Sequence, residues 1–191
     1  MSSPESINEL PFPTLADAAP AAKRSKIERE VMELFDQFRN PLLRYGLSLG
    51  LSIHDSEEVM QEVFLALFRH LQLGRSRKNL RSWLFRVTHN LALKQRLANQ
   101  TLLQRTSGDT SLAEGHAAPA LNPEEQISAD QRRDRLRAVV EALPEKDQHC
   151  LRLRAEGLRY REIATVLGMS LGAVSISLTR SLARLTRADG R

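Results

Sequence analysis

Residues 160–185, YREIATVLGMSLGAVSISLTRSLARL, contain two helical patterns that meet at a tight corner between Gly168 and Ser170. Gly168 supplies the left-handed conformation that ends many helices, and Ser170 can cap the helix that follows. On a helical wheel, one side of the second helix carries an apolar stripe of Leu171, Val174, Leu178, Leu182 and Leu185. The corner predicts a helix-turn-helix, which places its second helix in the major groove of DNA. An ordinary corner between two packed helices is the alternative.

The face opposite this stripe is composed of small residues, an isoleucine and basic residues near its end. These residues are Gly172, Ala173, Ile176, Thr179, Arg180 and Ala183, with Ser175 and Ser177 on the flanks and Arg184 and Arg187 beyond. Small side chains allow close approach to the groove, Ile176 can contact a thymine methyl group, and Thr179 can bond a base edge. Contact of Ile176 with another domain or a partner protein is the alternative.

The rest of the chain predicts an all-α protein with two small helical domains. Few β-branched residues run together, and no Asn-Gly or Asp-Gly hairpin turn occurs. Apolar residues recur at helical spacing over residues 27–99 and again over 123–187, with Pro41 expected to bend or break the first helix. Residues 1–26 are predicted to be a mobile tail, 100–122 a flexible linker, and 188–191 a short tail.

One long segment carries only positive charge. No acidic residue lies between Glu62 and Asp109, and the net charge of the chain is +5. Such a block favours contacts with nucleic-acid phosphates. Trp83 interrupts it and can stack on single-stranded bases, although its spacing also fits a core position. The candidate contacts in this segment are Arg77, Lys78, Arg81, Trp83, Arg86, Asn90 and Lys94.

The segment before this block is acidic and amphipathic, so it predicts a protein-binding surface. Its candidate residues are Asp55, Glu58, Gln61, Glu62 and Leu65. Neither a histidine nor a cysteine accompanies these carboxylates at catalytic or metal-ligand spacing, and no phosphate-binding glycine loop occurs. We therefore expect neither enzyme activity nor a metal or cofactor.

A single cysteine, Cys150, excludes an intramolecular disulfide and is expected to be a small core residue. No apolar run approaches the roughly 20 residues that span a bilayer, and the N-terminus lacks a signal pattern. We therefore expect a cytoplasmic protein without membrane insertion.

The chain resembles bacterial RNA polymerase sigma factors of the extracytoplasmic-function (ECF) type. DSEEVMQEVFLALFRHL resembles their region 2.2, LRSWLFRVTHNLALKQR resembles regions 2.3 and 2.4, and residues 122–185 resemble region 4. The family often has Lys-Ser-Arg where Ser175, Ile176 and Ser177 stand here.

The resemblance implies a function and partners. The acidic residues would dock on the clamp helices of the largest polymerase subunit, region 4 on the flap, and an anti-sigma factor would hold the chain inactive. The basic segment would open the −10 promoter element, with Trp83, Arg86 and Asn90 at the separated strand. The −35 element would be read by Gly172, Ala173, Ser175, Ile176, Thr179, Arg180 and Arg184.

Two other functions compete with this interpretation. A conventional helix-turn-helix regulator would bind operator DNA as a dimer, but no dimerisation element or effector domain is visible in the sequence. An RNA-processing enzyme would use the cationic block, but the catalytic residues that it needs are not found.

Overall fold

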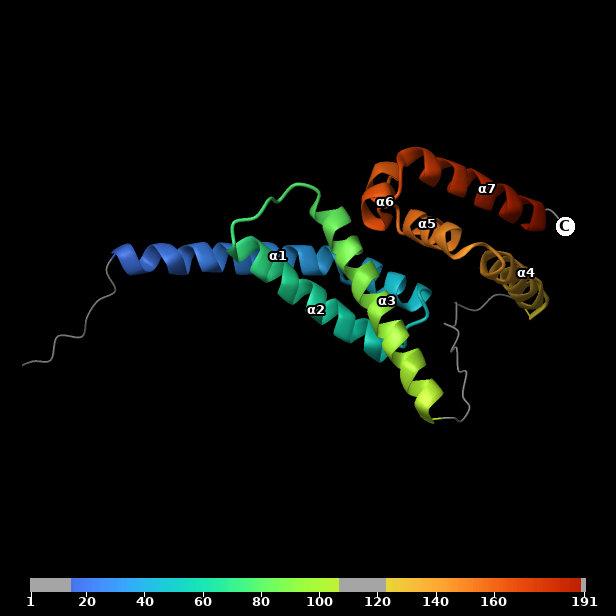
Figure 1. Cartoon of the computed structure of the whole chain (residues 1–191), viewed down its shortest axis with the longest axis horizontal. Helices are drawn as coiled ribbons and strands as arrows, with labels where there is room; N and C mark the ends of the chain where they lie inside the picture. The colour runs from blue at the N-terminus through green and yellow to red at the C-terminus, as the bar shows by residue number, and fades with distance from the viewer. Residues whose placement is uncertain (1–14, 107–122, 190–191) are drawn as a thin grey trace, which may run out of the picture.

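The computed structural model describes residues 15–106 and 123–189, and this part of the chain consists of seven helices (Figure 1). The first half contains α1 (Leu15–Ser48), α2 (Ile53–Gln72) and α3 (Leu80–Thr106). The second half contains α4 (Pro123–Glu141), α5 (Glu145–Ala155), α6 (Tyr160–Leu167) and α7 (Leu171–Asp189). No strand occurs in the described ranges, and the all-α prediction is confirmed.

The three helices of the first half pack around an apolar core. Phe35 of α1 meets Phe64 of α2 edge to face, with 4.9 Å between the ring centroids. Tyr45 of α1 packs against Phe85 of α3 at 5.6 Å. Aromatic pairs of this kind stabilise the helix contacts beyond the apolar area that they bury. Because α1 and α3 both pack on α2, the polar face of α2 points away from the core.

The second half also buries apolar residues beneath the helix-turn-helix. Its buried apolar residues are Leu143, Cys150, Leu153, Leu158, Ile163, Val166, Val174 and Leu178. Cys150 is fully buried, as expected, and burial raises the pKa of its thiol. It therefore serves as a small core residue.

The two halves are in contact in this structure, because α6 packs against α3 and α5 touches α1. Figure 1 shows α6 beside the N-terminal end of α3, with α5 and α7 extending away from the first half. Except for Leu143, the buried apolar residues of both halves form one continuous cluster.

Several helix ends differ from the sequence prediction. Residues 15–26 belong to α1 and residues 100–106 to α3, where a tail and a linker were expected, and α7 continues to Asp189. These segments lack apolar periodicity, but periodicity marks packing, and a helix can extend beyond its packed part on propensity alone. The remaining parts of the predicted tails and linker, residues 1–14, 107–122 and 190–191, lie outside the described residues.

Pro41 lies within the continuous helix α1, so of the predicted bend or break, the break does not occur. Proline removes one N–H donor from a helix and normally weakens it there. Phe38 and Leu42, on either side of Pro41, are both buried in the core. Their packing holds the helix together across the proline.

Candidate functional site

The corner between α6 and α7 has the geometry that its sequence predicts. Gly168 adopts the left-handed conformation, with φ 63° and ψ 31°. Ser170 caps the next helix, because its Oγ accepts a hydrogen bond of 3.2 Å from the N–H of Ala173. The chain bends by 108° between the two helices. This steep turn presents α7 as the second helix of a helix-turn-helix.

The buried face of α7 is rotated from the predicted apolar stripe. Val174 and Leu178 are fully buried, but Leu171 and Leu182 are each 46% exposed. Ser177 and Ser181 are buried in their place. The predicted stripe therefore does not coincide with the buried face at Leu171 and Leu182, since the small serines, rather than the flanking leucines, let α7 approach its neighbours closely.

The burial of Ser177 is explained by Asp147 on α5, a residue that the sequence analysis missed. Asp147 is only 3% exposed, and its Oδ1 accepts a hydrogen bond of 2.7 Å from the Ser177 hydroxyl. Its Oδ2 accepts from Nε of Arg180 at 3.1 Å, and Nη2 of Arg180 bonds the same oxygen. Charge-assisted bonds to a buried carboxylate fix the orientation of an arginine. Arg180 is thus held in place and retains other N–H donors for a ligand.

The other predicted reading residues of α7 form the outward surface of the helix. Gly172, Thr179 and Arg184 are exposed, and Ala173 and Ser175 are partly exposed. Ile176 is 67% exposed. An isoleucine this exposed has no packing role within the described structure, so the surface is open to a ligand.

The first half presents a mixed acidic and apolar surface on α2. Glu58, Gln61 and Glu62 are exposed, and Leu65 is 59% exposed beside them. We call these four residues the α2 surface. Charged residues around an exposed leucine are typical of a protein-docking surface.

Asp55, the fifth predicted docking residue, is only partly exposed, and its carboxylate is engaged by neighbouring side chains. Ser52 donates to its carboxylate at 2.7 Å, and the side-chain amides of Gln95 and Asn99 on α3 each donate at 3.1 Å. These hydrogen bonds, that of Ser52 first, hold the pKa of Asp55 below its usual range. Asp55 therefore fastens the start of α2 to α3.

The basic segment contains both exposed side chains and side chains that pair with other parts of the chain. Lys78, Arg86, Asn90 and Lys94 are exposed along α3 and the turn before it. Arg77 instead pairs with Glu30 of α1, with Nε and Oε1 2.9 Å apart. The exposed residues form a basic surface on which phosphates can be contacted.

Trp83 and Arg81 are both engaged in packing between elements. The Trp83 ring is partly exposed and lies 4.8 Å from the ring of His70, between centroids, next to the core of the first half. Arg81 donates a hydrogen bond of 2.9 Å to the backbone oxygen of Glu156 in the second half. The two halves thus meet at a residue that was predicted to bind DNA.

The comparisons with known proteins agree with this arrangement. Residues 34–101 match the family profile described as sigma-70 region 2, and residues 133–185 match the profile described as sigma-70, region 4. The chain is 30% identical over 145 residues to the RNA polymerase sigma-H factor of Pseudomonas aeruginosa, an alignment that covers 71% of this chain and 75% of that protein. The chain belongs to the ECF family of RNA polymerase sigma factors.

Two further relatives extend the comparison of this sigma factor. It is 31% identical over 157 residues to the ECF RNA polymerase sigma factor SigE of Mycolicibacterium smegmatis, covering 80% of this chain and 59% of that protein. Its fold resembles the sigma factor RpoE in complex with the anti-sigma factor NepR from Bartonella quintana, with a TM-score of 0.58 and 19% identity. That structural match covers 82% of this chain and 96% of the other.

Two further properties of the sigma factor concern its described residues alone. Among them, no group of three or more His, Cys, Asp or Glu side chains has the arrangement that could hold a metal ion. No single described helix is long and apolar enough to cross a membrane; α6 and α7 together reach the required length and composition but are bent by 108°.

Proposed function

We propose that this sigma factor binds core RNA polymerase through the α2 surface, contacts the −10 element through the basic surface of α3, and reads the −35 element with α7. In this role it is not an enzyme; it gives the polymerase promoter specificity and assists strand separation in the cytoplasm. The observation that carries the proposal is that one chain presents three distinct surfaces, which differ in charge and polarity. An acidic and apolar surface suits a protein, while the basic surface of α3 and the outward face of α7, which carries Arg180 and Arg184, suit DNA.

To bind both promoter elements at once, the two halves must lie farther apart than they do in this structure. Asn79, at the start of α3, lines one cleft together with Arg159, Gly172 and Ser175 of the second half, and the cleft has a volume of about 860 Å³. Elements about 25 base pairs apart are separated by about 85 Å of duplex, at 3.4 Å per base pair. The halves must therefore separate before both elements are bound.

Transcription with purified components tests the proposal. Core polymerase is incubated with the chain and with the DNA upstream of the chain's own gene, and run-off products are measured. We expect a transcript with one defined start that depends on both the chain and the core enzyme. A footprint on duplex DNA without polymerase, with no dependent transcript, would instead favour a conventional helix-turn-helix regulator.

An anti-sigma factor is the further partner that we propose. The RpoE neighbour was solved with its anti-sigma factor NepR, which supports a partner of the same kind for this chain. The exposed α2 surface and the outward face of α7 are the surfaces that such a protein would cover. A candidate anti-sigma factor is tested by whether it blocks the run-off transcript when it is added at a concentration equal to that of the chain.

Ile176 provides a prediction about promoter sequence. Replacing it by alanine removes the methyl contact and is expected to change preference at one −35 base pair by about 1 kcal/mol, the scale of a single base contact. Transcription from a library of −35 variants measures this change. Leu182→Ala, an exposed position outside the predicted reading face, is the matched control and should leave the profile unchanged. An unchanged profile for Ile176→Ala would remove Ile176 from the reading residues.

A further inference from the structure

The contact between the two halves is built from charges of complementary sign. Arg44 of α1 pairs with Glu156 at 2.8 Å, and Arg96 of α3 pairs with Glu145 of α5 at 2.7 Å. Arg81 adds its bond to the backbone of Glu156 and lies 4.0 Å from Glu162. All the arginines come from the first half and all the glutamates from the second. These pairs are partly exposed, so salt screens them.

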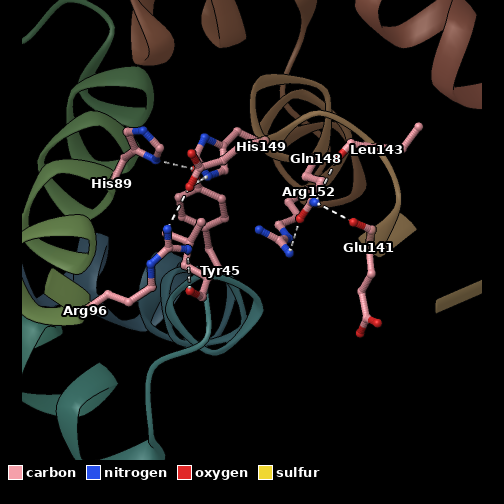
Figure 2. A network of polar contacts seen from close by, with 10 residues as sticks. Tyr45, His89, Arg96, Glu141, Leu143, Gln148, His149 and Arg152 are labelled. Atoms are coloured by element: carbon pink, nitrogen blue, oxygen red, sulfur yellow. Dashed lines mark hydrogen bonds and ion pairs between the residues drawn. The ribbon is translucent and has the colours of Figure 1, made fainter. Parts of the chain in front are cut away.

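Two histidines occupy the buried centre of the same contact. His89 of α3 and His149 of α5 are 7% and 6% exposed, and their rings meet edge to face with 4.8 Å between centroids. Nδ1 of His89 lies 2.9 Å from the hydroxyl of Tyr45 on α1. Nε2 of His149 is buried and has no hydrogen-bond partner within the described residues. Figure 2 shows Tyr45, His89 and His149 gathered between the halves, with Arg96 beside them.

We propose that this contact is an acid-sensitive closure: uptake of protons by His89 and His149 separates the two halves and releases Arg81 and the cleft beside α7. The closure itself is a property of the free chain. Only its effect on promoter binding rests on the proposed function. In the closed arrangement Arg81 is engaged and Gly172 faces the first half across the cleft. The α2 surface remains exposed, so the closed chain can still meet polymerase.

The surroundings of the two rings disfavour positive charge. Burial first, and then the neighbouring His149, lower the pKa of His89 to about 4, with Arg96 acting in the same direction and Glu145 against it. Burial likewise lowers the pKa of His149, assisted by Arg152 and Arg96 and opposed by Glu145. Tyr45 on α1 stays protonated, because burial raises the pKa of its hydroxyl. Cys150 of α5, which faces Tyr45, is also neutral because burial raises the pKa of its thiol.

The direction of the pH effect follows from these shifts. When the halves separate, both imidazoles return to water, where the ordinary pKa is 6.5. Closure is therefore fully stable above about pH 6.5 and weakens as the pH falls towards 4, because protons bind the open chain more tightly. From His89 alone, the closing equilibrium constant is expected to fall about tenfold between pH 7.5 and pH 5.5. Glu145 remains ionised in this window because Arg96 lowers its pKa, so its ion pair responds to salt and not to acid.

Energy transfer between two dyes on the full chain tests the proposal. Cys150→Ala removes the native thiol, and cysteines at the exposed positions Gln37 and Thr186 carry the dyes. Transfer efficiency is followed as sodium chloride is raised, at pH 7.5 and at pH 5.5. We expect salt to separate the halves at both pH values, with a clearly lower midpoint at pH 5.5. Equal midpoints, or no separation at any salt concentration, would overturn the closure.

A variant without the titrating rings provides the control. His89→Gln combined with His149→Gln keeps neutral polar side chains of similar reach, and its midpoints should coincide at the two pH values. A pH shift that persists in this variant would assign the effect to other groups and overturn the proposal. Helical circular dichroism at both pH values verifies that each chain is folded. Because no polymerase or promoter is present, a failure here leaves the proposed transcription function standing.

Discussion

Replacing Glu62 by lysine is expected to lower the affinity of the chain for core RNA polymerase by about tenfold to a hundredfold. Glu62 is exposed near the centre of the α2 surface, next to Leu65, which is 59% exposed. A partner complementary to this surface presents positive charge to it, and the expected loss corresponds to about 1.4–2.8 kcal/mol from the juxtaposition of like charges at the rim of an interface. Competition with a labelled wild-type chain for purified core enzyme measures the loss.

Glu33 offers a matched control on the same half of the molecule. It is an exposed glutamate of α1, away from the α2 surface, so Glu33→Lys makes the same change in net charge. Its affinity for core enzyme should stay within about twofold of the wild type, since isolated surface charges contribute little. Equal losses in both variants would mean that total charge, and not the α2 surface, determines binding.

The features that the sequence predicted correctly depend on neighbouring residues. Gly168 and Ser170 lie within the corner that they shape, and their roles follow from a left-handed glycine and a serine cap. Signals of this kind act over three or four residues, so they are visible without knowledge of the fold.

The features that the sequence missed depend on residues far apart in the chain. Ser177 is buried because Asp147, 30 positions earlier, accepts its hydroxyl. Asp55 is tied to Gln95 and Asn99, which are 40 and 44 positions later. Apolar periodicity cannot identify such partners, because a polar residue with a buried partner looks like a surface residue in the sequence.

The hydrogen bond from Arg81 to Glu156 was missed for the same reason. Its partner Glu156 is 75 positions away in the other half, and the packing of the halves is specified by several such pairs together. A basic residue in a cationic block was predicted to contact DNA, but its partner Glu156 in the free chain could not be predicted from the sequence. The role of Arg81 at the −10 element therefore remains a prediction for the separated halves.

Leu178→Ala is expected to destabilise the second half by about 2–5 kcal/mol, the usual loss for a leucine removed from a packed core. Leu178 is fully buried between α7 and its neighbours, whereas Leu182, one turn later, is 46% exposed. Leu182→Ala is therefore the matched control, and we expect a change of less than about 0.5 kcal/mol. The comparison tests which side of α7 faces the core, because the apolar stripe in the sequence treats the two leucines as equivalent.

Urea unfolding with two probes separates the halves in this measurement. Trp83, the single tryptophan, lies in the first half, so its fluorescence reports that half, while circular dichroism at 222 nm follows the helices of both. In Leu178→Ala the dichroism should show an early transition that precedes the fluorescence change, because the second half unfolds first once its core contains a cavity. Equal losses for the two leucine variants would place Leu182 in the core and reverse the assignment of the α7 face. The reading role of Ile176 would then fail with it, since Ile176 is free for DNA only if α7 is oriented as the structure shows.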